Sequence, residues 1–109
     1  MNQKTNTNDF KKISDYYNSL AKEGTKESVK KIMENINLEM GIIESKIIDY
    51  ALGLINNTEG INTLEKYLFE GTQIQRNYCT LYFNRKEEFK LVRLAYDQGL
   101  IDERQAFSR

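Results

Sequence analysis

The sequence predicts an all-α protein that folds as a compact array of about five to six helices. Three observations support this fold class. Apolar residues recur at spacings of three and four through most of the chain, and period-two alternation, which would favour strands, persists nowhere. The chain also contains no proline to interrupt a helix. At 109 residues, the chain is expected to form one domain spanning residues 1–109.

The first part of the chain predicts a leader and one helix. Residues 1–8 are polar and aperiodic, so we expect a frayed leader that ends in a helix cap at Asn8 or Asp9. Gly24 follows where a left-handed residue would end the next helix. The apolar stripe of that helix is Phe10, Ile13, Tyr17, Leu20 and Ala21. Residues 9–57 are therefore expected to carry the longer helices of the domain.

The segment 25–55 predicts one long helix that Thr25 caps, because its apolar spacing keeps phase from Val29 to Leu54. Asn35, Asn37 and Gly41 are poor helix formers within it, so two helices are the alternative. Further apolar residues lie beside the main stripe: Leu38, Ile42, Ile48, Leu52 and Ile55. Apolar residues on more than one face predict a homodimer through the helix 25–55.

Residues 58–109 predict short helices that end at glycines. Gly71 and Gly99 each end a helix. Thr72 with Gln75, and Asp102 with Gln105, have the spacing of a capping box that begins the next helix. Asn84 and Arg85 are expected to form the intervening turn. The expected inward residues are Ile61, Leu64, Leu68, Ile74, Tyr78, Leu81, Tyr82, Phe89, Val92, Ala95, Tyr96, Ala106 and Phe107.

Two stretches of this half can be aligned. LEKYLFEGTQIQRNY, from Leu64, and VRLAYDQGLIDERQA, from Val92, share a glycine at Gly71 and Gly99 and an arginine at Arg76 and Arg104. A helix, a glycine and a capped helix with an early arginine resemble the helical hairpins of HEAT-like repeat proteins. The caps are out of step by two residues, and the resemblance covers residues 58–109. It implies a binding scaffold rather than a catalyst.

Composition argues against several classes of function. Sixteen basic side chains balance sixteen acidic ones, so no overall field attracts nucleic acid or an anionic membrane. The absence of histidine argues against an enzyme and against a metal site. Cys79 is expected to be a buried inert thiol, and no motif indicates a cofactor. With no signal-peptide-like or membrane-spanning run, we expect a cytoplasmic protein; its Lys, Asn and Ile richness suggests a bacterial or phage source.

A protein-binding surface is the favoured functional interpretation. Eight of the chain's twelve aromatic residues lie in its last 43 positions. Tyr67, Phe69 and Phe83 sit off the inward stripes, and exposed aromatics near arginine are frequent anchors of protein interfaces. With them, the predicted partner-binding residues are Tyr67, Phe69, Arg76, Asn77, Phe83, Arg93 and Arg104. The chain would act as an adaptor, regulator or inhibitor of a protein partner.

A helix-turn-helix-like DNA-binding regulator is the alternative. The helix 73–84 would enter the major groove, with residues 70–72 as the turn. Its expected outward residues are Gln73, Arg76, Asn77, Thr80 and Asn84, which are types that read base edges. Tyr67 is large where the motif needs a small residue, and Asn77 is polar where it needs an apolar one. A solvated polar face is the simpler interpretation of this helix.

Overall fold

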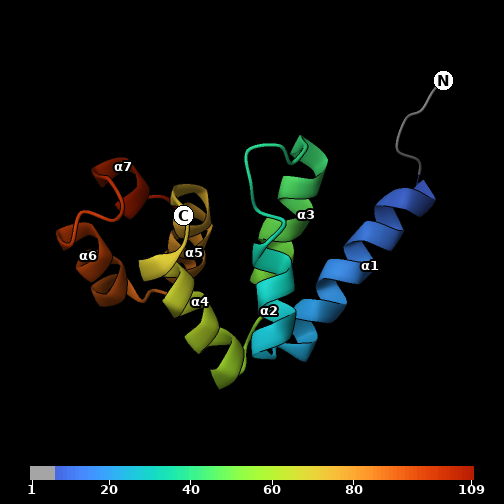
Figure 1. Ribbon diagram of the computed structural model, residues 1–109, viewed down its shortest axis with the longest axis horizontal. Helices are drawn as coiled ribbons and strands as arrows, with labels where there is room; N and C mark the ends of the chain where they lie inside the picture. Colours follow the sequence, from blue (N-terminus) through green and yellow to red (C-terminus); the bar gives the residue numbers. More distant parts are fainter. Residues whose placement is uncertain (1–6) are drawn as a thin grey trace.

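The computed structural model describes residues 7–109 and contains seven helices within them (Figure 1). They are α1 (Thr7–Glu23), α2 (Lys26–Met33), α3 (Ile42–Leu52), α4 (Thr58–Glu70), α5 (Gln73–Arg85), α6 (Phe89–Asp97) and α7 (Glu103–Ala106). The described residues form no strand. The all-α class is confirmed, with one helix more than expected. Apart from Thr7 and Asn8, the predicted leader lies outside the described residues.

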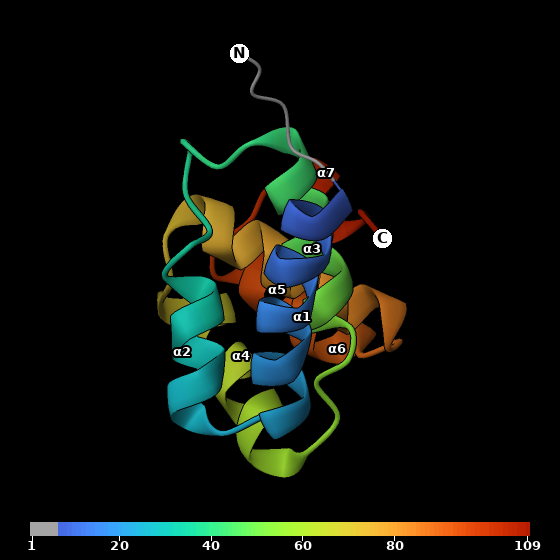
Figure 2. The same ribbon diagram turned by 90° about the vertical axis from the view of Figure 1, so that its right-hand side faces the viewer.

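The helices pack both against neighbours in the chain and against helices two places away. Helix α1 contacts α2 and α3, α2 contacts α4, and α5 contacts α4, α6 and α7. The result is an array that extends 48 Å along its longest axis and 27 by 20 Å across it. Figures 1 and 2 show α1 at one end of this axis and α6 with α7 at the other. Helices α1–α3 form an amino-terminal group, and α4–α7 a carboxyl-terminal group.

Most helix ends follow the local signals in the sequence. Gly24 and Gly99 have positive φ values, 64° and 76°, after α1 and α6. Thr25 caps α2, and reciprocal capping boxes begin α5 and α7 at Thr72 and Asp102. Two boundaries were predicted wrongly. Asn8 and Asp9 were expected to cap the first helix, but both lie within α1. Asn84 and Arg85 were expected to form a turn, but they are the last two residues of α5.

The single helix predicted over 25–55 is wrong, and the two-helix alternative is correct. Helix α2 ends at Met33 and α3 begins at Ile42. Between them, the side-chain amide of Asn35 donates to the backbone carbonyl of Lys31. The side-chain oxygen of Asn37 accepts from the backbone N–H of Glu39. Such local bonds compete with the helical pattern and stabilise a turn. The apolar periodicity continues across this break because both helices bury one face.

The break also changes the predicted dimer surface along 25–55. Ile48, Leu52 and Ile55, expected beside the main stripe, lie in the core. Leu38 and Ile42 remain exposed. Three of the five additional apolar residues therefore pack inside one chain, and the predicted homodimer through residues 25–55 stays a prediction.

One core and several polar links join the two groups of helices. The Tyr82 hydroxyl donates to the Ile55 carbonyl at 2.6 Å. The side-chain amide of Gln75 donates to the Met33 carbonyl at 3.0 Å. Arg85 and Asp49 form an ion pair at 3.0 Å. The largest fully buried side chains include members of both groups: Ile32, Met33, Ile48, Leu52, Ile55, Leu64, Leu68 and Phe83. The two groups therefore share one hydrophobic core.

Candidate protein-binding groove

A turn that contains a left-handed residue leads into helix α6, which exposes its aromatic side chains. Glu87 has a positive φ of 64°, and the Glu88 amide donates to the Phe83 carbonyl at 2.8 Å. After this turn, α6 buries only its Val92 and Ala95 side. The side that carries Phe89, Arg93 and Tyr96, at spacings of four and three, faces away from the core.

Helix α7 is short and buries none of its own residues, so other elements hold it in place. The buried Asn84 amide donates to the carbonyls of Ala106 and Ser108, at 2.9 and 2.6 Å. Arg76 donates to the Leu100 carbonyl in the connection before α7 and to the Gly71 carbonyl before α5. These polar side chains of α5 position the carboxyl-terminal segment beside α6.

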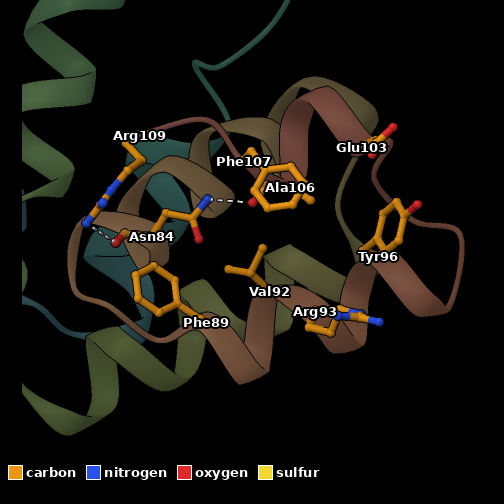
Figure 3. A pocket seen from close by; sticks show the side chains of 9 residues that line it. All are labelled: Asn84, Phe89, Val92, Arg93, Tyr96, Glu103, Ala106, Phe107 and Arg109. Atoms are coloured by element: carbon orange, nitrogen blue, oxygen red, sulfur yellow. Dashed lines mark hydrogen bonds between the residues drawn. The ribbon is translucent and has the colours of Figure 1, made fainter.

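A groove of about 520 Å³ lies between α6 and the carboxyl-terminal segment (Figure 3). Its lining residues come from the end of α5, from α6 and from the segment beginning at α7: Asn84, Phe89, Val92, Arg93, Tyr96, Glu103, Ala106, Phe107 and Arg109. Figure 3 shows Phe89 and Tyr96 toward opposite ends, with Val92 between them. We call this site the α6–α7 groove. Its volume falls within the range of small-ligand and side-chain pockets.

Aromatic and cationic groups dominate the surface of the α6–α7 groove. Phe107 is 78% exposed and Phe89 is 51% exposed. The Arg109 guanidinium lies over the Phe89 ring, 5.5 Å from its centroid, which is a cation–π contact. Arg93 pairs with Asp97 on the same helix at 3.1 Å, and both side chains are largely exposed. Exposed rings beside arginines are the composition typical of binding hot spots.

The predicted aromatic site residues do not form this surface. The prediction of an exposed Phe83 is wrong, because this side chain is 1% exposed and packs edge-on against Tyr82 in the core. Tyr67 and Phe69 are half-buried and pack against the core. Burial raises the pKa of the Tyr67 hydroxyl, and the nearby Glu34 and Cys79 side chains raise it further. None of the three lines the α6–α7 groove.

The polar site residues are divided among three places. Arg93 alone lines the α6–α7 groove. Arg76 is half-buried and holds two backbone carbonyls, so its main role is structural. Asn77 and Arg104 line a second groove of about 850 Å³, between the 34–41 connection, α5 and α7. That groove is larger, but half of its twelve lining residues are uncharged and polar, and none of them is aromatic.

The predicted base-reading face of helix 73–84 is wrong at two positions. Thr80 is 0% exposed and donates to the Arg76 carbonyl, whereas Asn84 is buried against the carboxyl-terminal segment. The physical reason is that α5 is covered by α4, α6 and α7 together. A helix surrounded in this way must bury part of its polar side, and its hydrogen bonds compensate for that burial.

Phe89, Tyr96, Phe107 and Arg109 are the groove residues that sequence reasoning missed. Phe89 and Tyr96 were placed inward with Val92 and Ala95. One feature of the sequence distinguishes the exposed pair, Phe89 and Tyr96, from the buried pair, Val92 and Ala95. Phe89 and Tyr96 share a side with Arg93, whereas Val92 and Ala95 form a narrow side without a charged residue. That signal favours burial of the smaller pair.

The described residues hold no cluster of His, Cys, Asp and Glu that could bind a metal ion. Cys79 is buried as predicted, and burial raises the pKa of its thiol. Among helices of the described part, none is long and apolar enough to cross a membrane. Comparison with protein-family models, curated proteins and solved structures finds no match to this chain.

The HEAT-like resemblance stays a prediction. Gly71 is extended, with φ −77°, whereas Gly99 is left-handed. Helix α5 has 13 residues and α7 has four, so the two aligned stretches differ in the length of their second helix. Arg76 nevertheless bonds both connections, through the carbonyls of Gly71 and Leu100.

Proposed function

We propose that this chain is a small non-catalytic protein-interaction module that acts as an adaptor, regulator or inhibitor by binding a protein partner in the α6–α7 groove. The observation that carries the proposal is that three exposed rings, Phe89, Tyr96 and Phe107, line one groove together with Arg109. Solvent exposure of three large rings in one concave site leaves apolar area that a partner can bury. The module would act through stoichiometric binding.

The groove favours a partner segment with an apolar anchor beside an acidic residue. Phe89 from α6 and Phe107 from the segment after α7 supply apolar surface on the two walls of the groove. The Arg109 guanidinium at the same site would pair with a carboxylate. A partner side chain such as leucine or phenylalanine would therefore enter the groove, and a neighbouring Asp or Glu would fix its orientation.

Three observations support a protein partner over a DNA duplex. The chain has balanced charge, whereas duplex binding depends on neutralising phosphates. Thr80 and Asn84 are buried, so they cannot reach base edges without unfolding part of the chain. Arg76 is already bonded to two carbonyls. We further propose that the module acts in the cytoplasm, where a free thiol such as Cys79 stays reduced.

Selection from a displayed library of random peptides would test the proposal without knowledge of the natural partner. We expect enrichment of peptides with an apolar residue next to an acidic one. The double variant Phe89→Ala/Phe107→Ala should lower their affinity at least about tenfold, because it removes both walls. Leu94→Ala is the matched control, since Leu94 is exposed on α6 but does not line the groove.

Two results would contradict the proposal. One is a selection that enriches no peptide, and the other is equal binding by the double variant and wild type. Binding to a labelled DNA duplex, measured at several salt concentrations, tests the DNA-binding alternative separately. Salt-sensitive duplex binding that Arg93→Ala leaves unchanged, and that Arg76→Ala abolishes without loss of helicity, would favour the alternative.

A further inference from the structure

The outer flank of α1 carries a second feature, far from the α6–α7 groove. A shallow groove of about 380 Å³ is lined by five residues, all on this one helix: Asp15, Tyr16, Ser19, Leu20 and Glu23. Figure 2 shows α1 in front of the other helices, with none of them crossing its outer side. Tyr16 is 51% exposed on this flank.

The five residues form two parallel rows on the helix surface. Asp15, Ser19 and Glu23 follow one another at spacing four, and so do Tyr16 and Leu20. A groove between two such rows is the surface into which a second helix inserts its own row of side chains. Within the described residues, no other helix of the chain lines it. The shape therefore fits a helix that comes from another molecule.

The charges on α1 match a second copy of the same helix. Lys12 and Glu23 are eleven residues apart, which is about three turns or about 16 Å, so they share one side. An antiparallel pair of α1 helices around a twofold axis between Tyr17 and Asn18 places each Lys12 opposite the Glu23 of the copy. Glu23 also accepts a hydrogen bond from the Ser28 hydroxyl, which holds its carboxylate at the end of the groove.

We infer that the chain forms a homodimer in which α1 packs antiparallel against α1 of a second copy, with Tyr16 and Leu20 at the centre and two Lys12–Glu23 pairs at the edges. Such an interface is isologous, as closed dimers require. One pair of helices buries less than a standard interface of about 800 Å² per partner. The dimer is therefore expected to dissociate on dilution.

The location of this interface has a functional consequence. Helix α1 lies at one end of the molecule's longest axis, and the α6–α7 groove lies at the other (Figure 1). A dimer through α1 leaves both α6–α7 grooves open and places them at its two far ends. It would hold two partner segments at once, and a partner with two such segments would bind with avidity. The dimer itself does not depend on what the groove binds.

Sedimentation velocity from about 1 µM to about 1 mM protein would measure the dimer. We expect wild type to shift from monomer to dimer across this range. Lys12→Glu and Glu23→Lys each place like charges opposite each other, so each variant alone should dimerise at least about tenfold more weakly. An equimolar mixture of the two variants should dimerise again, because both edge pairs then regain opposite charges.

Ser19→Arg provides a test that does not depend on Glu23, whose bond to Ser28 supports the turn after α1. Ser19 is exposed, so the arginine should block the groove while circular dichroism stays unchanged. Lys66→Glu, on the exposed side of α4, is the charge control and should dimerise like wild type. Monomer at every concentration, or a dimer that Ser19→Arg leaves intact, would overturn the inference.

Discussion

Helices α5 and α6 follow one another in the chain but distribute polar and aromatic residues in opposite ways. Helix α5 buries the polar Thr80 and Asn84, together with the Phe83 ring. Helix α6 buries the small Val92 and Ala95 and exposes the Phe89 ring. The difference shows that residue type did not decide burial in this half of the molecule. The number of neighbouring helices did, because α5 is covered on several sides and α6 is not.

The contrast also separates structural from binding roles. The buried polar groups of α5 donate to backbone carbonyls, which removes the penalty of burying them and fixes the carboxyl-terminal segment. In the part of the chain that the structure describes, the exposed rings of α6 fix no backbone group, and the Arg109 guanidinium lies over Phe89. Substitutions in α5 should therefore change stability, whereas substitutions in α6 should change partner binding.

The largest expected difference is between Phe83→Ala and Phe89→Ala. Phe83→Ala leaves a cavity in the core and should lower the free energy of unfolding by about 3–5 kcal/mol. Phe89→Ala removes an exposed ring and should change it by less than about 1 kcal/mol. Urea denaturation followed by circular dichroism measures both. Equal losses would mean that the two rings are equally buried, and the contrast between the helices would fail.

Asn84→Ala tests the attachment of the carboxyl-terminal segment. The substitution leaves the Ala106 and Ser108 carbonyls without their donor, so we expect a loss of about 1–3 kcal/mol in the free energy of unfolding. Trypsin should also cleave faster after Arg104, because α7 would detach more often. Asn62→Ala, on the exposed side of α4, is the control. Unchanged cleavage would show that Asn84 does not hold the segment.

The smallest effect concerns the pH dependence of stability. Burial raises the pKa of the Cys79 thiol in the folded state above its unfolded value, about 9. The folded state therefore keeps a proton that the unfolded state loses. The contribution of Cys79 is fully present below pH 9 and declines as pH rises further, by up to about 1.4 kcal/mol per pH unit.

Cys79→Ala should remove this contribution. Denaturation between pH 8 and about pH 10 should then show a shallower decline than wild type, whatever the variant does to stability at neutral pH. Tyr82 remains in both proteins, and burial raises the pKa of its hydroxyl as well, so some alkaline loss should persist in the variant. A variant with the wild-type pH slope would indicate that Cys79 is accessible to solvent.

Sequence reasoning was accurate where a signal acts within a few residues. Gly24 and Gly99 follow helices because a glycine adopts a positive φ at low cost, and Thr72 begins α5 because its side chain bonds the Gln75 amide. These outcomes depend on residues at most three positions apart. The break after Met33 was only an alternative, because the apolar periodicity of 25–55 continues across it.

The candidate site was less accessible to the same reasoning. The concentration of aromatic and arginine residues in the last third of the chain points to the region that contains the α6–α7 groove, and Arg93 lines that groove. The prediction of an exposed Phe83 was wrong, and Tyr67 and Phe69 do not line the groove. Phe83 and Phe89 are both phenylalanines on amphipathic helices, and no local pattern shows which of them other helices will cover.

The sequence by itself determined that the chain is helical, where most of its helices begin and end, and that Cys79 lies in the core. Those properties depend on hydrophobic period and on short-range capping. Only the tertiary structure decided that Asn84 holds the carboxyl-terminal segment, that Phe107 stays exposed, and that α1 keeps an open flank. Burial depends on which helices meet across the molecule, and residues far apart in the chain make those contacts.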